Sequence, residues 1–196
     1  MIYKAYIGDG GHYREVLAHS NVDVVRFVED EYYDGKLNTL PLSQFDSKKY
    51  SVMIAIADSQ VRSRISKLLP EDTKYFSYID PSVILLDKKN IVIGEGSFIG
   101  ANCILTTNIT IGKHTILNRG VQVGHDVVIG DCFSAMGNSV ISGNVTIGDN
   151  VYMGNNSSIK EKTKICNDVI IGMNGCVVKN IDKRGTYVGV PVKKIK

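Results

Sequence analysis

The chain has 196 residues, of which 43% are hydrophobic, and its formal net charge at pH 7 is +3. This length holds one large domain or two small ones, and so small a charge argues against a nucleic-acid partner. No apolar run reaches the roughly 18 residues of a membrane helix and no signal peptide is recognisable, so we expect a cytoplasmic protein without a membrane span.

Residues 1–90 alternate between segments typical of strands and segments typical of helices. The apolar patterns predict strands at residues 2–8, 22–28, 51–57 and 74–79, and helices at residues 12–19 and 59–69. Strands and helices in this order indicate a small parallel α/β, Rossmann-like subdomain. We expect it to occupy residues 1–80.

The first predicted strand runs into the stretch GDGGH, which a helix follows. Glycines there let backbone N–H groups and a helix N-terminus approach a phosphate, although glycine turns after strands are also common. Glu29 and Asp30 close the second strand, where α/β folds often bind a ribose or a base edge. The alternative for these two acidic residues is a solvated loop.

From Ile91 to Asn180 the chain reads as fifteen consecutive six-residue repeats, called hexapeptides below, beginning IVIGEG, SFIGAN and CILTTN. The third position is apolar every time and β-branched residues are common, which indicates short strands separated by turns. Glycine recurs at the fourth position and asparagine at the sixth. Both residues tolerate positive φ, which we expect the corners between strands to need.

Three such sides would close a triangular coil in which residue i stacks on residue i+18. Third-position side chains then point inward, and first-position residues such as Val121, Val127, Val145 and Val151 add to the core. Fifteen hexapeptides make five coils. The sequence predicts an all-β parallel β-helix over residues 81–196, including a C-terminal tail.

Two surface features concern partners. The flat faces of such a prism invite self-association, so we expect a homo-oligomer, most simply a homotrimer. From Ser157 to Lys196 there are nine Lys and Arg residues against three Asp and Glu residues. This excess of positive charge suits an anionic partner, or it reflects solvated lysines at strand edges.

One hexapeptide, VQVGHD, contains a histidine followed directly by an aspartate. His125 occupies the fifth position next to a corner, so its side chain should face outward. Gly143 lies eighteen residues later and would leave room and an accessible N–H beside the imidazole. A carboxylate from Asp126 within reach would fix the histidine tautomer and raise its basicity. The pair is either a catalytic base with its partner or a surface histidine in a turn.

A zinc site is the alternative to this interpretation. The β-helix contains two histidines, His114 and His125, and His114 would stack on Cys132. Two ligands from one face do not complete a tetrahedral site, and the four cysteines show no metal-ligand spacing. We therefore expect no bound metal and reduced cysteines.

The chain resembles bacterial sugar acetyltransferases of the hexapeptide-repeat superfamily, of the PglD and NeuD type. The similarity extends over essentially the full length. Its most specific stretches are LNRGVQVGHDVVIGD in the repeat and VKNIDKRGTYVGVPVKKI at the end, and moderate matches are GDGGHYREV, FVED and AIADSQVRSRI.

The resemblance implies a left-handed β-helix and a set of roles. His125 would be the general base, Asp126 its acidic partner, and Asn118 a residue near the acceptor. Gly143 would offer its N–H to the acetyl carbonyl, and Ser134, Asn155 and Met173 would lie along the acetyl-CoA groove between subunits. Six residues of the N-terminal subdomain fall where the family holds a UDP-sugar: Gly10, Gly11, His12, Glu29, Asp30 and Ala57.

Four residues depart from the family pattern. Ser134 replaces a histidine that touches the cofactor, and Tyr13 replaces a small residue after GGH. Ala57 replaces a glycine at the nucleotide site, and Val192 replaces the usual alanine of the terminal motif.

We therefore expect an acetyl-CoA-dependent N-acetyltransferase of glycan biosynthesis that acts on a UDP-linked amino sugar. His125 would remove a proton as the amine attacks the thioester directly. A sugar O-acetyltransferase of the sialic acid kind would use the same base on a hydroxyl. A non-catalytic β-helix that serves as a binding surface would need neither the His–Asp pair nor the α/β subdomain.

Overall fold

The computed structural model describes residues 2–20 and 24–196. The chain divides into two compact units, Met1–Ser77 and Tyr78–Lys196. The boundary was expected at residue 80. It lies earlier because the predicted strand at residues 74–79 is two strands, β5 (Lys74–Tyr75) and β6 (Tyr78–Ile79), each of which joins the sheet of a different unit.

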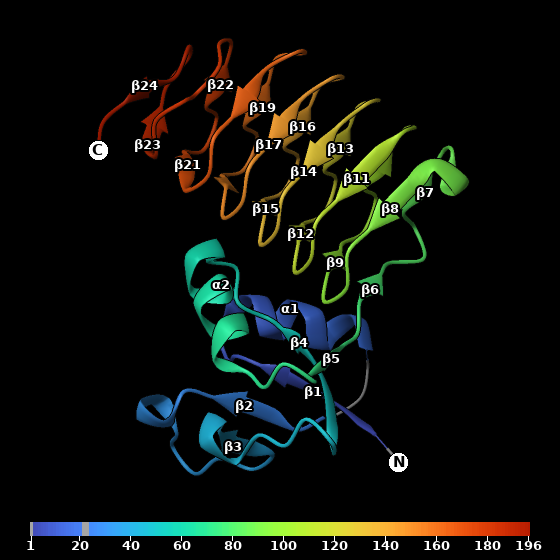
Figure 1. Cartoon of the computed structure of the whole chain (residues 1–196), viewed down its shortest axis with the longest axis vertical. Helices are drawn as coiled ribbons and strands as arrows, with labels where there is room; N and C mark the ends of the chain where they lie inside the picture. Colours follow the sequence, from blue (N-terminus) through green and yellow to red (C-terminus); the bar gives the residue numbers. More distant parts are fainter. Residues whose placement is uncertain (1, 21–23) are drawn as a thin grey trace. The chain divides into compact units, whose positions relative to one another are not determined.

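The first unit contains a five-stranded parallel sheet in the order β3-β2-β1-β4-β5 (Figure 1). Besides β5, its elements are β1 (Tyr3–Ile7), α1 (Gly11–Ser20), β2 (Arg26–Val28), the 3₁₀ turn η1 (Asp30–Tyr32), β3 (Thr39–Pro41), the 3₁₀ turn η2 (Leu42–Gln44), β4 (Tyr50–Ile54) and α2 (Ser59–Leu68). The predicted strand at residues 22–28 corresponds to β2, and residues 22 and 23 lie outside the described residues.

Local sequence explains where α2 begins. The carboxylate of Asp58 accepts hydrogen bonds from the backbone N–H groups of Gln60 and Val61, both at 2.9 Å. An N-cap of this kind satisfies donors that the first helical turn leaves unpaired. Ile65 on α2 packs with apolar residues of the central strands, including Ile7 and Ile54, to form the core of the first unit.

The second unit is a parallel β-helix made of three sheets. One sheet consists of β7 (Ile84–Leu85), β10 (Ile104–Leu105), β13 (Gln122–Val123), β16 (Val140–Ile141), β19 (Ser158–Ile159) and β22 (Cys176–Val177). A second consists of β8 (Ile91–Ile93), β11 (Ile109–Ile111), β14 (Val128–Ile129), β17 (Thr146–Ile147) and β20 (Lys164–Ile165). The third consists of β6, β9 (Phe98–Ile99), β12 (Ile116–Leu117), β15 (Ser134–Ala135), β18 (Tyr152–Met153), β21 (Val169–Ile171), β23 (Gly185–Val188) and β24 (Lys193–Lys194).

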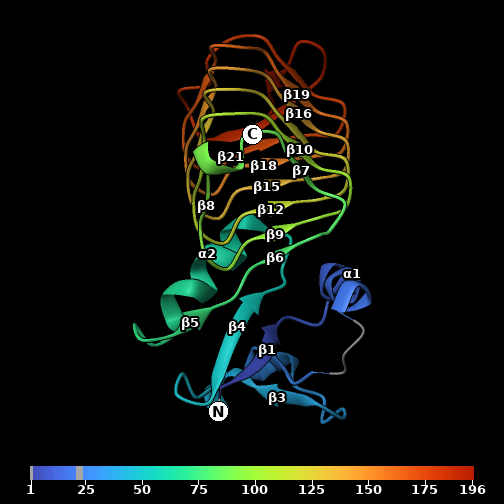
Figure 2. The ribbon, with the colours of Figure 1, turned by 90° about the vertical axis from the view of Figure 1, so that its right-hand side faces the viewer.

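The register within these sheets is the predicted one. Leu117 pairs with Ala135, and Val123 pairs with Ile141, so residue i lies beside residue i+18. Figure 2 shows the successive turns of the chain stacked on one another.

The stacked strands begin before the first hexapeptide. β6 and β7 pair with β9 and β10 at an offset of twenty residues, for example Ile84 with Ile104. The 3₁₀ turn η3 (Lys88–Asn90) lies in this segment, so the first turn of the β-helix is out of phase with the repeat. At the other end, β24 pairs antiparallel with β23 and places Lys193 and Lys194 on the edge of the sheet. Lysines at an edge discourage pairing with further strands.

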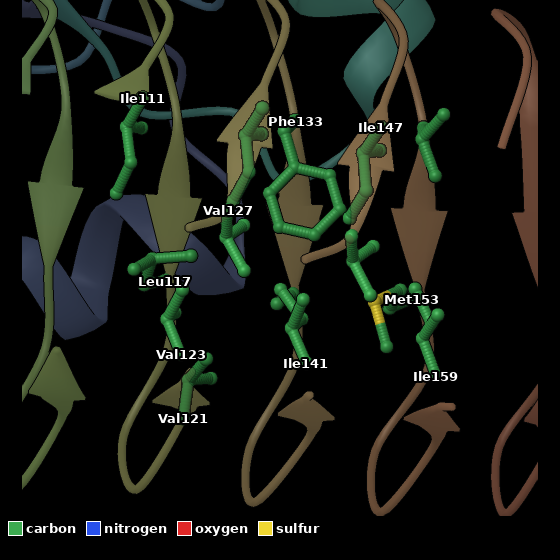
Figure 3. Packing of buried hydrophobic residues seen from close by; sticks show 14 of the residues in the cluster. Ile111, Leu117, Val121, Val123, Val127, Phe133, Ile141, Ile147, Met153 and Ile159 are labelled. Atoms are coloured by element: carbon green, nitrogen blue, oxygen red, sulfur yellow. The ribbon is translucent and has the colours of Figure 1, made fainter. Parts of the chain in front are cut away.

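The interior of the β-helix follows the repeat closely. Third-position side chains from Ile99 to Val177, and first-position residues from Ser97 to Val169, are each exposed by no more than 3%. Figure 3 shows third-position residues such as Leu117 and Ile141 next to first-position residues such as Phe133. Each fully buried aliphatic side chain contributes about 1.5–3 kcal/mol, so both columns stabilise the stack.

Positive φ belongs to the sixth position of the repeat. Every sixth residue from Gly96 to Asn174 has φ between 52° and 73°, whichever residue occupies it. The position is left-handed even at Asp126 and Lys162, where no asparagine or glycine is present. The backbone path of the coil therefore overrides the local preference for negative φ.

Our expectation that the fourth-position glycines also supply positive φ is wrong, because none of them has positive φ among the described residues. They are required for space. A Cβ would lie 2.5–3.1 Å from backbone atoms of the next coil at seven of these positions: Gly94, Gly100, Gly112, Gly124, Gly130, Gly148 and Gly154.

The four cysteines are free. Within residues 2–20 and 24–196, neither α1 nor α2 has the length and hydropathy that a bilayer-spanning helix needs.

Candidate functional site

His125 and Asp126 form a hydrogen-bonded pair at a corner of the β-helix. The imidazole Nδ1 lies 2.7 Å from Asp126 Oδ2, and the two side chains are 57% and 44% exposed. Two neighbouring side chains can meet here because Asp126 has a φ of 58°, which turns its carboxylate toward the preceding residue. The outward orientation expected for His125 is confirmed.

The Asp126 carboxylate is held from a second side. Its Oδ1 accepts a hydrogen bond from Asn108 Nδ2 at 2.6 Å, and Asn108 lies eighteen residues earlier, on the preceding coil. Hydrogen bonds from Asn108 and then from His125 hold the pKa of Asp126 below its ordinary value. An ionised carboxylate can only accept, so the His125 nitrogen that faces it carries the proton. The other nitrogen, Nε2, is then free to take a proton.

The imidazole stands directly against Gly143. A Cβ at residue 143 would lie 2.5 Å from His125 Nε2, 2.7 Å from Cε1 and 3.0 Å from Cδ2. The first two distances are shorter than those of real Cβ contacts, so the ring occupies its present place only because residue 143 has no side chain. The stacking of Gly143 beside His125, expected from the repeat, is confirmed.

The N–H of Gly143 is best understood by comparing two corners. The acidic corner is defined by the fifth-position residues Lys113, Asp131, Asp149 and Asn167, and the backbone N–H of each of the first three donates to the side chain eighteen residues later. Asp131 Oδ1 accepts from Lys113 N at 2.7 Å, Asp149 Oδ1 from Asp131 N at 2.8 Å, and Asn167 Oδ1 from Asp149 N at 3.0 Å.

At the histidine corner, defined by the fifth-position residues Thr107, His125, Gly143 and Glu161, that arrangement is broken. In the described part of the chain, the N–H of Gly143 has no hydrogen-bond acceptor. The residue eighteen positions later is Glu161, whose carboxylate lies 3.9 Å from Lys160 Nζ. A backbone donor is therefore available next to Nε2 of the imidazole.

The remaining residues expected along the cofactor groove lie elsewhere on the β-helix. Asn155 and Met173 are exposed fifth-position residues that stack at the corner after β18 and β21, not at the histidine corner. Ser134, in β15, is fully buried. Asn118 is half-buried, and its Oδ1 accepts a hydrogen bond from Arg119 N at 2.7 Å. A single chain thus does not bring these residues to His125.

The first unit contains a pocket of about 480 Å³ at the carboxyl ends of β1, β2 and β4. Five of the six expected substrate residues line it: Gly10, Gly11, His12, Glu29 and Ala57. Asp30 lies outside the lining, and its Oδ1 accepts from Ser43 N at 3.0 Å. Gly8 also lines the pocket, with a φ of 118° that favours glycine, and a Cβ there would lie 2.8 Å from Ile56.

His12 is buried at the N-terminal end of α1. Burial lowers its pKa, while the nearby Glu15, whose Oε2 lies 3.3 Å from His12 Nδ1, opposes the shift. Because burial disfavours the imidazolium, His12 is neutral at pH 7 and offers a polar ring without charge.

Two arginines of α2 were not found from the sequence: Arg64, which lines this pocket, and Arg62, which does not line it but contacts two of its lining residues. Arg64 makes a bidentate ion pair with Glu29, with Nη1–Oε2 at 2.6 Å and Nη2–Oε1 at 2.9 Å, and these hydrogen bonds lower the pKa of Glu29. Arg62 is fully buried and donates to the carbonyl oxygens of Ile56 at 2.6 Å and Ala57 at 3.2 Å. The Asp58 cap marks where α2 begins, but no signal in the sequence shows where α2 lies against the end of β2.

Within the described residues, no group of three or more His, Cys, Asp or Glu side chains is arranged to hold a metal ion. His114 is buried at the sixth position of its hexapeptide, at the acidic corner rather than the histidine corner.

Comparison with known proteins gives the following likenesses. No family model matches the chain. A curated protein of Arabidopsis thaliana, the probable UDP-3-O-acylglucosamine N-acyltransferase 2, mitochondrial, is 34% identical over 110 residues, which are 54% of this chain and 36% of the plant protein. The chain therefore spans about a third of the length of that curated relative.

Two solved structures match over nearly their whole length. WeeI from Acinetobacter baumannii AYE is 27% identical with a TM-score of 0.88, and all of both chains is covered. A mutant of perosamine N-acetyltransferase from Caulobacter crescentus, solved with CoA and GDP-perosamine, is 22% identical with a TM-score of 0.85 over 99% of this chain and 97% of that one. The chain therefore shares the fold of these two solved structures, and part of its sequence is similar to that of the plant N-acyltransferase.

Proposed function

We propose that the protein transfers an acetyl group from acetyl-CoA to the amino group of a nucleotide-linked amino sugar. The observation that carries the proposal is the histidine corner, where His125 is oriented by Asp126 and stands beside the unpaired N–H of Gly143. Two of the proteins named above, those of Arabidopsis thaliana and Caulobacter crescentus, support the chemical class, since their names describe N-acyl or N-acetyl transfer to sugars.

The reaction proceeds by direct attack. The amine nitrogen of the sugar forms a bond to the thioester carbonyl carbon, and His125 Nε2 takes the proton that the nitrogen loses. The Gly143 N–H donates to the carbonyl oxygen as negative charge develops on it. The carbon–sulfur bond then breaks, and the proton passes from His125 to the sulfur of CoA, which leaves as the thiol.

The expected contributions are substantial. A positioned general base accelerates a reaction by about 10²–10⁴-fold. Loss of a single donor to a developing oxyanion costs about 10²–10³-fold. No covalent acyl-enzyme is required, because the imidazole serves as a proton acceptor and not as a nucleophile.

The acetyl-CoA site is part of the proposal. The Caulobacter crescentus structure was solved with CoA, which supports the same co-substrate here. Asn155 and Met173 lie on a different corner from His125 within one chain, so a second copy would have to bring its corner after β18 and β21 to the histidine corner. This arrangement is why we propose a homotrimer. The basic residues near the C-terminus would face the phosphates of CoA.

The acceptor nucleotide is assigned to the pocket of the first unit. Its volume of about 480 Å³ falls within the range of small-molecule sites. The glycine turn after β1 and the start of α1 offer backbone N–H groups to a diphosphate. A UDP-linked amino sugar is the acceptor that we propose, in a Rossmann-like unit joined to a left-handed β-helix of a cytoplasmic enzyme.

The test measures thiol release from acetyl-CoA with a panel of UDP-linked and GDP-linked amino sugars and with free sialic acids. One amino sugar should support turnover, and His125→Ala should lower that turnover by several orders of magnitude without loss of fold. His19→Ala, which removes an exposed histidine from the end of α1, is the matched control. Near-normal turnover by the His125 variant would refute the base assignment, and turnover on sialic acids alone would indicate O-acetylation.

A further inference from the structure

Asn108 is the last residue of the hexapeptide CILTTN, one coil before Asp126. Both residues occupy the sixth position of the repeat, and both have positive φ, 52° for Asn108 and 58° for Asp126. The left-handed backbone at each corner directs the two side chains along the stack, so that the amide of one meets the carboxylate of the other. Asn108 Nδ2 lies 2.6 Å from Asp126 Oδ1.

The amide orientation follows from chemistry. A carboxylate can only accept hydrogen bonds, so the side-chain group of Asn108 that faces it is the NH₂ group and not the carbonyl oxygen. The other carboxylate oxygen, Oδ2, lies 2.7 Å from His125 Nδ1. Asn108, Asp126 and His125 thus form a continuous line of donors and acceptors across two coils.

We propose that Asn108 is a positioning residue, which fixes the Asp126 carboxylate in the orientation that presents Oδ2 to His125. Its catalytic consequence rests on the proposed function, because His125 must first be the general base. Its structural consequence, control of the histidine tautomer through Asp126, does not depend on which substrate the protein uses.

The exposure of the site explains why such a residue is needed. With 44% of the Asp126 side chain exposed, water competes for both carboxylate oxygens, and a surface ion pair alone holds its partners loosely. A second hydrogen bond on Oδ1 leaves the carboxylate one favourable rotamer. The backbone is fixed as well, since Asp126 N donates to Thr107 O at 3.1 Å.

A bridge of the same kind is also found in a place without a histidine. Asn150 Nδ2 lies 3.1 Å from Asp168 Oδ1, again between sixth-position residues eighteen apart, and the residue before Asp168 is Asn167. A purely structural role of the bridge would be shared by both pairs. Only the Asn108 bridge ends on an imidazole, which makes Asn150 the matched control.

The test compares Asn108→Gly with Asn150→Gly. Glycine removes the amide and keeps the left-handed backbone without strain, which alanine would not do. A third variant, Asn108→Asp, keeps the size of the side chain and replaces the donor with a second carboxylate. Melting curves establish that each variant is folded. The readouts are the ¹⁵N shifts of the His125 ring, which report the tautomer, the ¹³C titration of the Asp126 carboxyl, and kcat and KM.

Asn108→Gly should lower the population of the Nδ1–H tautomer and raise the pKa of Asp126, and Asn108→Asp should do both more strongly. Asn108→Gly should also lower kcat by about tenfold, which is the effect of losing one hydrogen bond to a charged group, and it should leave KM unchanged. Asn150→Gly should change none of these. An unchanged tautomer and carboxyl titration in Asn108→Gly, or an equal loss of kcat in Asn150→Gly, would overturn the proposal. Should His125→Ala retain turnover, the proposed function fails, and the two spectroscopic readouts still decide the role of Asn108.

Discussion

Gly143→Ala tests the packing of the imidazole with a single added carbon. The new Cβ would lie 2.5 Å from His125 Nε2, whereas ordinary contacts begin at 3.4 Å. The ring must therefore retreat by roughly 1 Å, and it can do so because it is 57% exposed. A displacement of about 1 Å from the reactive geometry costs about 10²-fold in rate, so we expect kcat to fall by about that factor.

The fold should tolerate this change, because Gly143 does not have positive φ and its neighbour is the end of a movable side chain. The assay is the initial rate of thiol release at saturating acetyl-CoA, with a melting curve for each protein. Thr110→Ala, which shortens an exposed side chain of β11, is the control. Wild-type turnover in Gly143→Ala would refute the placement of the reacting atoms beside Nε2.

Three further changes probe other parts of the molecule. Asp126→Asn should reduce kcat by about 10²-fold or more with little change in stability, because an amide no longer fixes the Nδ1–H tautomer; rates and melting curves check this. Arg64→Met should weaken nucleotide binding measured by calorimetry. In the wild type, the ion pair of Arg64 with Glu29 also stabilises the fold above about pH 4.5, and this stabilisation is lost as the pH falls through the lowered pKa of Glu29. Denaturation curves of Arg64→Met should lack this pH dependence of stability. Phe133→Ala should cost about 3–5 kcal/mol in chemical denaturation because the ring is fully buried, whereas the exposed Thr110→Ala should cost less than about 0.5 kcal/mol.

The architecture of the β-helix could be predicted because the same pattern of apolar residues recurs in every hexapeptide. One apolar residue at each third position fixes which side chains point inward, and a constant spacing then fixes the pairing of Leu117 with Ala135 and all equivalent pairs. The first turn of the stack escaped prediction because the segment with Lys88–Asn90 shifts the offset to twenty residues. The six-residue period predicts the strand register only where the sequence repeats without interruption.

The role of the fourth-position glycines could not be read from propensity. Glycine is selected both for positive φ and for close approach, and one sequence cannot distinguish these causes. The structure distinguishes them, since Gly124 does not have positive φ and a Cβ there would lie 2.7 Å from Gly143 N. In the first unit, β3 (Thr39–Pro41) was missed because a strand of three residues ending in proline has no alternating pattern to detect.

The residues of the candidate site could be predicted where they follow the offset of eighteen residues between paired strands. His125 and Asp126 are neighbours in sequence, and Gly143 follows from the offset of eighteen. Asn108 obeys the same offset from Asp126 and could have been found by applying it backward. Arg64 could not, because its contact with Glu29 joins residues 35 positions apart and depends on how α2 is placed against the end of β2.

A last prediction follows from the difference between the two corners. At the acidic corner the accepting oxygen lies over a fourth-position glycine, as Asp131 Oδ1 does over Gly112. At the histidine corner the fourth-position residue before Gly143 is Ser142, whose Cβ occupies that space. The double variant Ser142→Gly, Glu161→Asp should therefore rebuild the acidic arrangement, and the new carboxylate should capture the Gly143 N–H. We expect turnover to fall by about 10²-fold, as for loss of an oxyanion donor, while Ser142→Gly alone retains it. Full turnover in the double variant, with hydrogen exchange showing the Gly143 amide protected, would mean that this N–H takes no part in the reaction.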